Sequence, residues 1–304
     1  MAAIETALGA PLAGDGLTPY GEVFDRGYHH YDGPRLGRRG AFSALVLYSI
    51  QRAMGIKKSW SAKIIPFLLY LAVTAPVGIS LGIRVFLPTA NILDYPEFFG
   101  IIFILEGIFV ATITPEMLCG DRRENVLQLY FSRAITRLDY LVAKLVATAI
   151  LTLTMTFVPA LLLWLGRQFL ADQPFQAMAN NTGDLWRIGV AGFTIAAYLG
   201  SLGLLVSSFT GRKSIAVAVI IVGFIITESL AGALAAAIRR GTESMNDQWV
   251  LFLSPSSTAA GLVGRLFNEP GLGVEQPLWV IFAVMCGVVL ASLSLMYWRY
   301  VPNE

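Results

Sequence analysis

The 304-residue chain is too apolar and too weakly charged for a soluble domain: 56% of its residues are hydrophobic, 14% are charged, and its mean hydropathy is +0.65. Soluble domains carry about 45–50% apolar and about 25% charged residues. The apolar residues are grouped in runs long enough to cross a hydrocarbon core, which predicts an integral membrane protein. A net charge of +2 is too small to indicate a nucleic-acid-binding protein.

The N-terminal part of the chain divides into a tail and a basic, amphipathic segment. Residues 1–33 show no sustained hydrophobic period and are predicted to form a flexible cytoplasmic tail. The adjacent His29 and His30 in it are more simply solvated than part of a metal site or a proton relay. Residues 34–63 repeat apolar side chains at helical spacing between basic residues and end beside Trp60. This pattern predicts an amphipathic interfacial helix, and a helix packed on the protein itself fits it almost as well.

The rest of the chain, residues 64–304, is predicted to be an all-α, polytopic membrane domain. The predicted spans are residues 64–87, 98–113, 140–165, 185–209, 214–238 and 278–297. With the N-terminus inside, sixteen of the 22 lysines and arginines fall on the inner side and six on the outer side, so both termini are predicted to be cytoplasmic. In the fourth span, the small residues between Gly189 and Gly203 predict close helix packing.

A polar, helix-prone segment, residues 114–139, follows the second apolar run. Thr114–Glu116 predicts a helix start or a kink, because proline is tolerated at the first position of a helix. The i,i+4 pair of Val126 and Tyr130 predicts a short amphipathic surface helix, and Thr136–Asp139 forms a capping-box pattern before the third span. The residues alone leave two interpretations open, a rigid contact surface and a plain polar connector.

The segment between the fifth and sixth spans, residues 239–277, is too long for a plain turn. Trp249–Leu253 and Ala259–Phe267 are short apolar or amphipathic pieces, and Ser254-Pro255 separates them. Taken alone, this pattern indicates a structured extracellular loop.

One motif in the middle of the chain carries a family resemblance. Glu116 and Gly120 precede the run LQLYFSRAITRLDYLVAK at residues 127–144. This arrangement resembles bacterial permease subunits of the type-2 ABC transporter family. Positions that match the family run are Ile135, Thr136, Arg137, Tyr140 and Lys144, whereas Ala134 stands where proline is common. The Tyr28–Arg35 stretch and Leu253-Ser254-Pro255 are also similar to that family.

The resemblance implies a half-transporter in the bacterial plasma (inner) membrane. Two six-span permeases, identical or paired with a relative, would work with two separate ABC ATPase subunits, and export is the family's usual direction. Residues 34–63 would be an elbow helix, residues 114–139 would hold the coupling helix that docks on the ATPase, and short re-entrant helices would precede the sixth span. The implied ATPase-coupling residues are Glu116, Asp121, Arg122, Arg123, Glu124, Arg133 and Arg137.

The chain itself is predicted not to be an enzyme. A phosphate-binding loop needs Gly-x-x-x-x-Gly-Lys-Ser/Thr after a strand, and the nearest stretch, Thr210–Ser214, lacks that spacing. ATP and Mg would therefore be bound by the partner subunit, with no cofactor in this chain. Cys119 and Cys286 have no partner at metal-ligand spacing. The expected partners are two ATPase subunits, a second permease and membrane lipid, and not nucleic acid.

Two acidic residues, Glu106 and Glu228, fall inside predicted spans, where ionised carboxylates are costly. They are candidate pathway residues for cationic or amphiphilic cargo. Alternatively, they pair with Arg84 or with hydroxyl groups, or they are neutral.

Two other classes of protein stay open at this point. A secondary transporter usually shows internal repeats with broken helices at matching positions, and the sequence shows neither. A non-transporting structural membrane subunit is compatible with the sequence.

Overall fold

The protein is described from a computed structural model that covers residues 37–56, 60–87, 93–131, 135–241, 247–269, 271 and 273–300. The helical segments follow in this order: α1 (Gly37–Ala53), α2 (Trp60–Phe86), α3 (Tyr95–Arg123), α4 (Leu127–Phe131), α5 (Arg137–Phe169), α6 (Pro174–Asn180), α7 (Thr182–Phe209), α8 (Lys213–Gly241), the 3-10 helix η1 (Asp247–Leu253), α9 (Pro255–Phe267) and α10 (Leu278–Tyr300). These described residues contain no strand, which confirms the predicted all-α class. The predicted tail, residues 1–33, lies outside the described ranges.

Six of these helices, α2, α3, α5, α7, α8 and α10, are long and apolar enough to cross a membrane. This confirms the six predicted spans, and the chain is a multi-pass membrane protein. Most helix ends fall within a few residues of the predicted span ends, because a membrane-crossing helix must be apolar along its whole length.

The second span continues well beyond its predicted end. The helix α3 runs without interruption over Tyr95–Arg123, and Pro115 lies inside it. Of the two alternatives predicted at Thr114–Glu116, a helix start or a kink, the helix start is therefore wrong. The last turns of α3 bury Met117 and Leu118 where the helix packs on α5 and α7. Tertiary packing here outweighs the local preference of proline for a helix start.

The N-terminal amphipathic helix is shorter than predicted. It ends at Ala53, not at residue 63, and the chain starts again as α2 at Trp60. Gly55 follows α1 with a φ of +67°. A glycine adopts this conformation without strain, and it is a common way to end a helix.

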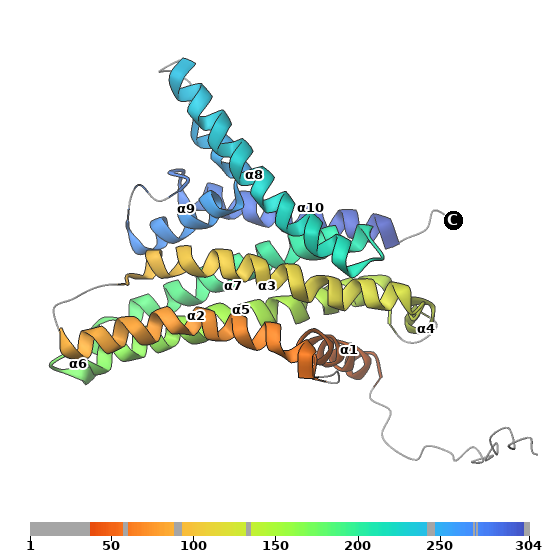
Figure 1. Ribbon diagram of the computed structural model, residues 1–304, viewed down its shortest axis with the longest axis horizontal. Helices are drawn as coiled ribbons and strands as arrows, with labels where there is room; N and C mark the ends of the chain where they lie inside the picture. Colours follow the sequence, from red (N-terminus) through yellow and green to blue (C-terminus); the bar gives the residue numbers. More distant parts are fainter. Residues whose placement is uncertain are drawn as a thin grey trace, which may run out of the picture. The chain divides into compact units, whose positions relative to one another are not determined.

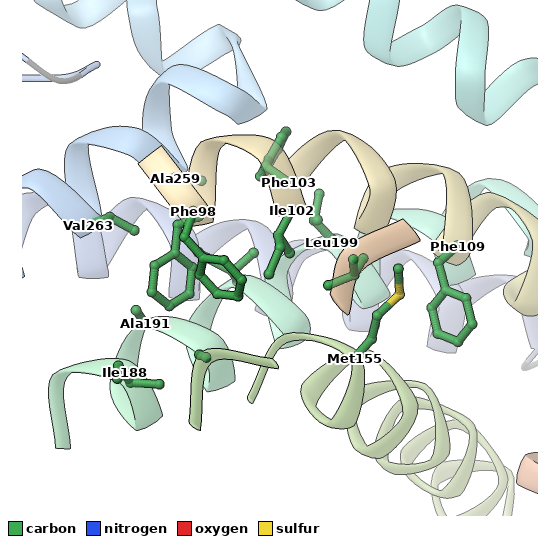
Figure 2. Packing of buried hydrophobic residues seen from close by; sticks show 14 of the residues in the cluster. Phe98, Ile102, Phe103, Phe109, Met155, Ile188, Ala191, Leu199, Ala259 and Val263 are labelled. Atoms are coloured by element: carbon green, nitrogen blue, oxygen red, sulfur yellow. The ribbon is translucent and has the colours of Figure 1, made fainter. Parts of the chain in front are cut away.

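The hydrophobic core lies where α3, α5, α7 and α9 meet. Figure 2 shows Phe98 and Ile102 of α3 among Ile188 of α7 and Val263 of α9, with Met155 of α5 close to α3 as well. The spans α3, α5 and α7 are the most buried, whereas most residues of α2, α8 and α10 are not buried. The bundle therefore has three central spans and three peripheral ones.

Small residues bring α7 close to its neighbours. A Cβ atom at Gly203 would overlap Val110 of α3, and one at Gly200 would lie 3.0 Å from Thr148 Cγ2 of α5. The close packing predicted for this span is confirmed at these two positions. At Gly189, by contrast, a Cβ would meet nothing within 4 Å.

The bundle has two ends, which we call the α1 end and the far end. The α1 end carries α1, α4 and the last turn of α10, and the far end carries α6 (Figure 1). Exposed tryptophans lie near both ends: Trp60 and Trp298 at the α1 end, Trp186 and Trp279 at the far end. Because tryptophan prefers the membrane–water interface, these positions mark the two faces of the membrane.

The two pieces predicted before the sixth span are both helical, as η1 and α9. Ser254 is the N-cap of α9 and Pro255 is its first residue. Serine and proline are favoured at these two positions, which explains why the helix starts here. Their depth in the membrane stays a prediction at this point.

Candidate functional site at the α1 end

A buried carboxylate joins three helices at the α1 end. Asp121, near the end of α3, is fully buried, and its two oxygens bind Arg52 of α1 at 2.8 Å and Lys144 of α5 at 2.7 Å. The hydroxyl of Tyr140, also on α5, donates a hydrogen bond to Asp121 at 2.9 Å. We call Arg52, Asp121, Tyr140 and Lys144 the junction. Buried charges are tolerated when they are paired and hydrogen bonded, and this set meets both conditions.

Arg52 connects the junction to the protein surface. Its Nη2 binds the exposed carboxylate of Glu124 at 2.9 Å, and its Nη1 donates to the Tyr48 hydroxyl at 3.4 Å. Burial lowers the pKa of Arg52, but nearby negative charge, chiefly that of Asp121, outweighs burial and raises the pKa above its usual value. The guanidinium is a permanent positive charge between a buried and an exposed carboxylate.

Gly120 makes room for this arginine. A Cβ atom at position 120 would overlap the guanidinium of Arg52. Any larger residue would push the guanidinium away from Asp121 and Glu124. The glycine is therefore required by the ion pairs, and not by backbone conformation.

An open cavity of about 400 Å³ lies beside the junction. Its walls come from α1, the end of α3 and the α7–α8 turn: Tyr48, Arg52, Pro115, Glu116, Cys119, Gly120, Arg123, Glu124, Gly211 and Lys213. Lys213 forms an ion pair with Glu116, and the side chain of Arg123 is 79% exposed. The rim of this cavity presents both signs of charge.

Several of the predicted coupling residues are buried, or they form hydrogen bonds and ion pairs within the protein. Asp121 belongs to the junction and has no exposed surface. Arg122 donates to the carbonyl oxygen of Ser208, and Glu116 pairs with Lys213. These residues hold the ends of α3, α7 and α8 together.

Other predicted coupling residues reach the surface. Arg123 and Glu124 are exposed at the end of α3. Arg137 is partly exposed, and its guanidinium lies 5.8 Å from the centre of the Phe131 ring of α4. Arg133 lies outside the described residues. A short helix of five residues, α4, lies within the predicted segment.

Sequence reasoning missed Arg52 as a member of this site. Its partner Asp121 is 69 residues away, and no local pattern links the two. Lys144 offered a signal, because a lysine that far into an apolar span needs an acidic partner. Acidic candidates lie at the end of the preceding span, where Asp121 is found.

The two acidic residues of the spans have different surroundings. Glu106 of α3 is fully buried, and neither of its oxygens makes a hydrogen bond within the described part of the chain. Glu228 of α8 is partly exposed and accepts hydrogen bonds from the hydroxyls of Ser254 and Ser256. The alternative that this carboxylate pairs with hydroxyl groups is therefore confirmed for Glu228.

The structure is thus a six-span helical membrane protein with a charged junction and an open cavity at one end of its spans. A family model described as ABC-2 family transporter protein matches residues 17–303. The chain belongs to this family and is a membrane permease subunit of an ABC transporter. A comparison with curated proteins finds no match.

Proposed function

We propose that this permease is half of the membrane part of an exporter, driven by two separate ATPase subunits that dock at the α1 end. Two copies, or one copy and a related permease, would form the substrate pathway between them in a bacterial plasma membrane. ATP and Mg would be held by the ATPase. The observation that supports the docking proposal is the exposed pair Arg123 and Glu124, which a buried junction holds beside an open cavity.

The junction gives this surface the stiffness that force transmission needs. Arg52 and Lys144 tie α1 and α5 to Asp121 of α3, so the three helices share one buried charge cluster. An ATPase that pushes on Arg123 or Glu124 would move these helices together. Rigid-body motion of this kind is a common way to pass a conformational change across an interface.

Charge reversal tests the docking surface. We expect Arg123→Glu, alone and with Glu124→Lys, to weaken binding of the partner ABC ATPase subunit at least tenfold, measured by co-purification and titration. The matched control is Arg240→Glu, which reverses an exposed charge at the other end of α8. Unchanged binding and transport in the Arg123 variants would place the coupling surface elsewhere. If the wild-type permease never brings down an ATPase, the proposal of an ATP-driven transporter fails.

We also propose Glu106 as a residue that governs passage of cationic or amphiphilic cargo. Glu106 is completely buried and accepts no hydrogen bond of normal geometry from the described residues, which supports a functional role because such a carboxylate is costly in a span. Glu106→Gln keeps the shape and removes the charge. We expect Glu106→Gln to change the transport rate and leave ATPase binding unchanged. A wild-type transport rate would show that Glu106 does not govern cargo passage.

A further inference from the structure

The turn between η1 and α9 lies against the middle of α8, where one carboxylate binds it. Glu228 is about halfway along the 29-residue α8, roughly 22 Å from its first residue at 1.5 Å per residue. Its Oε1 accepts the backbone N–H of Ser256 at 2.8 Å. Its Oε2 accepts the hydroxyls of Ser254 at 2.5 Å and Ser256 at 2.7 Å. The tip of this helical hairpin therefore reaches the level of the middle of a span.

These bonds complete the cap of α9. Pro255 at the first position has no N–H, and the N–H of Ser257 is bound by the Ser254 hydroxyl oxygen at 3.0 Å. The N–H of Ser256 has its acceptor in Glu228. A carboxylate at this end of a helix is also favoured by the helix dipole. The first turn of α9 thus depends on a residue of a different helix.

The two halves of the hairpin pack on different parts of the protein. The helix η1 packs mainly on α8, whereas α9 packs chiefly on α3, α10 and α7. At the C-terminal end of α9, the ring of Phe267 stacks on the ring of Tyr95 of α3, with 5.1 Å between the ring centres. Figure 1 shows that the C-terminal half of α8 extends away from the other spans. We call residues 228–241 of α8 together with η1 the arm.

We propose that Glu228, Ser254 and Ser256 form a latch that ties the arm to α9, which packs on the bundle, and that its release opens the far end of the permease. Glu228 is then a positioning residue for transport, because it acts through the placement of α9. Three hydrogen bonds from the hairpin occupy its carboxylate, which favours this role over direct contact with cargo. The latch goes beyond the docking proposal, and its test needs neither an ATPase nor a cargo.

Hydrogen–deuterium exchange of the full chain in lipid nanodiscs tests the cap. In Glu228→Leu we expect the amides of residues 256–258 to exchange at least tenfold faster than in the wild type. Glu228→Gln keeps one acceptor oxygen, so it should give a smaller increase, and Ser256→Ala serves if the leucine variant does not fold. The matched control is Glu97→Gln, which alters the capping box of α3 and should leave α9 unchanged. Unchanged exchange in α9 in the Glu228 variants overturns the latch.

A second measurement separates a latch from a cap that only stabilises the first turn. Ala259 of α9 is 3% exposed and packs in the core shown in Figure 2. With Cys119 and Cys286 replaced by serine, Ala259→Cys places one thiol behind the hairpin. We expect Glu228→Gln to speed its labelling by a small maleimide at least tenfold, with an unchanged melting temperature. If Glu228→Gln leaves the labelling rate at position 259 unchanged, the latch is overturned, even if hydrogen–deuterium exchange in the first turn of α9 has become faster.

Discussion

At the scale of single residues, Asp121 has two cationic partners and a tyrosine hydroxyl and no exposed surface. Replacing it by asparagine leaves Arg52 and Lys144 with one neutral acceptor between them. Arg52 then keeps only the exposed carboxylate of Glu124, and Lys144 loses its carboxylate partner, so the desolvation cost of the two buried cations is no longer fully offset.

We therefore expect Asp121→Asn to destabilise the protein by about 3–5 kcal/mol, as when one partner of a buried ion pair is removed. The measurement is thermal unfolding of the purified permease in detergent. Arg38→Gln is the matched control, because it removes an exposed ion pair with Asp139 of 2.8 Å and should leave the melting temperature nearly unchanged. Equal effects of the two changes would show that the junction adds no special stability.

At the scale of elements, the contact of α7 with α3 depends on the absence of a side chain at Gly203. The position faces Val110 and Thr114 at a distance that leaves no room for a Cβ. Close approach of this kind is how helices pack in membranes, where the hydrophobic effect does not drive them together.

Gly203→Ala should cost about 1–3 kcal/mol, because it overpacks a close helix contact. Gly189→Ala, on the same helix, has open space around it and should be neutral or slightly stabilising, since alanine favours a helix by about 1 kcal/mol over glycine. Thermal unfolding of both variants checks this. A neutral Gly203→Ala would mean that α3 and α7 can separate without cost.

The positions of the six spans could be predicted from sequence because hydropathy is a local property. The continuation of α3 past Pro115 could not, because its cause is packing on α5 and α7, which follow later in the chain. The charges of the 114–139 segment suggested a contact surface, but they did not show which of its residues are buried, because burial depends on helices elsewhere in the chain. Asp121 reads as a surface residue until the position of Arg52 is known.

At the scale of the whole molecule, the predicted orientation rests on the unequal distribution of basic residues. It makes a simple prediction about access from the two sides of the membrane. In a background without native cysteines, Phe175→Cys on α6 should react with an impermeant maleimide in intact cells. Arg39→Cys on α1 should react only after permeabilisation. Both positions are exposed in the protein, so a reversed pattern would mean an inverted topology.

The continuity of α3 has a mechanical consequence. One end of this helix carries Asp121 and the other carries Tyr95, which stacks on the last residue of α9. With 29 residues it is a strut of roughly 43 Å, and a tilt of about 5° at one end would displace the other by about 4 Å. A break in the helix at Pro115 would have absorbed that motion; because α3 is continuous, it acts as a lever between the junction at the α1 end and the end of α9 at the far end.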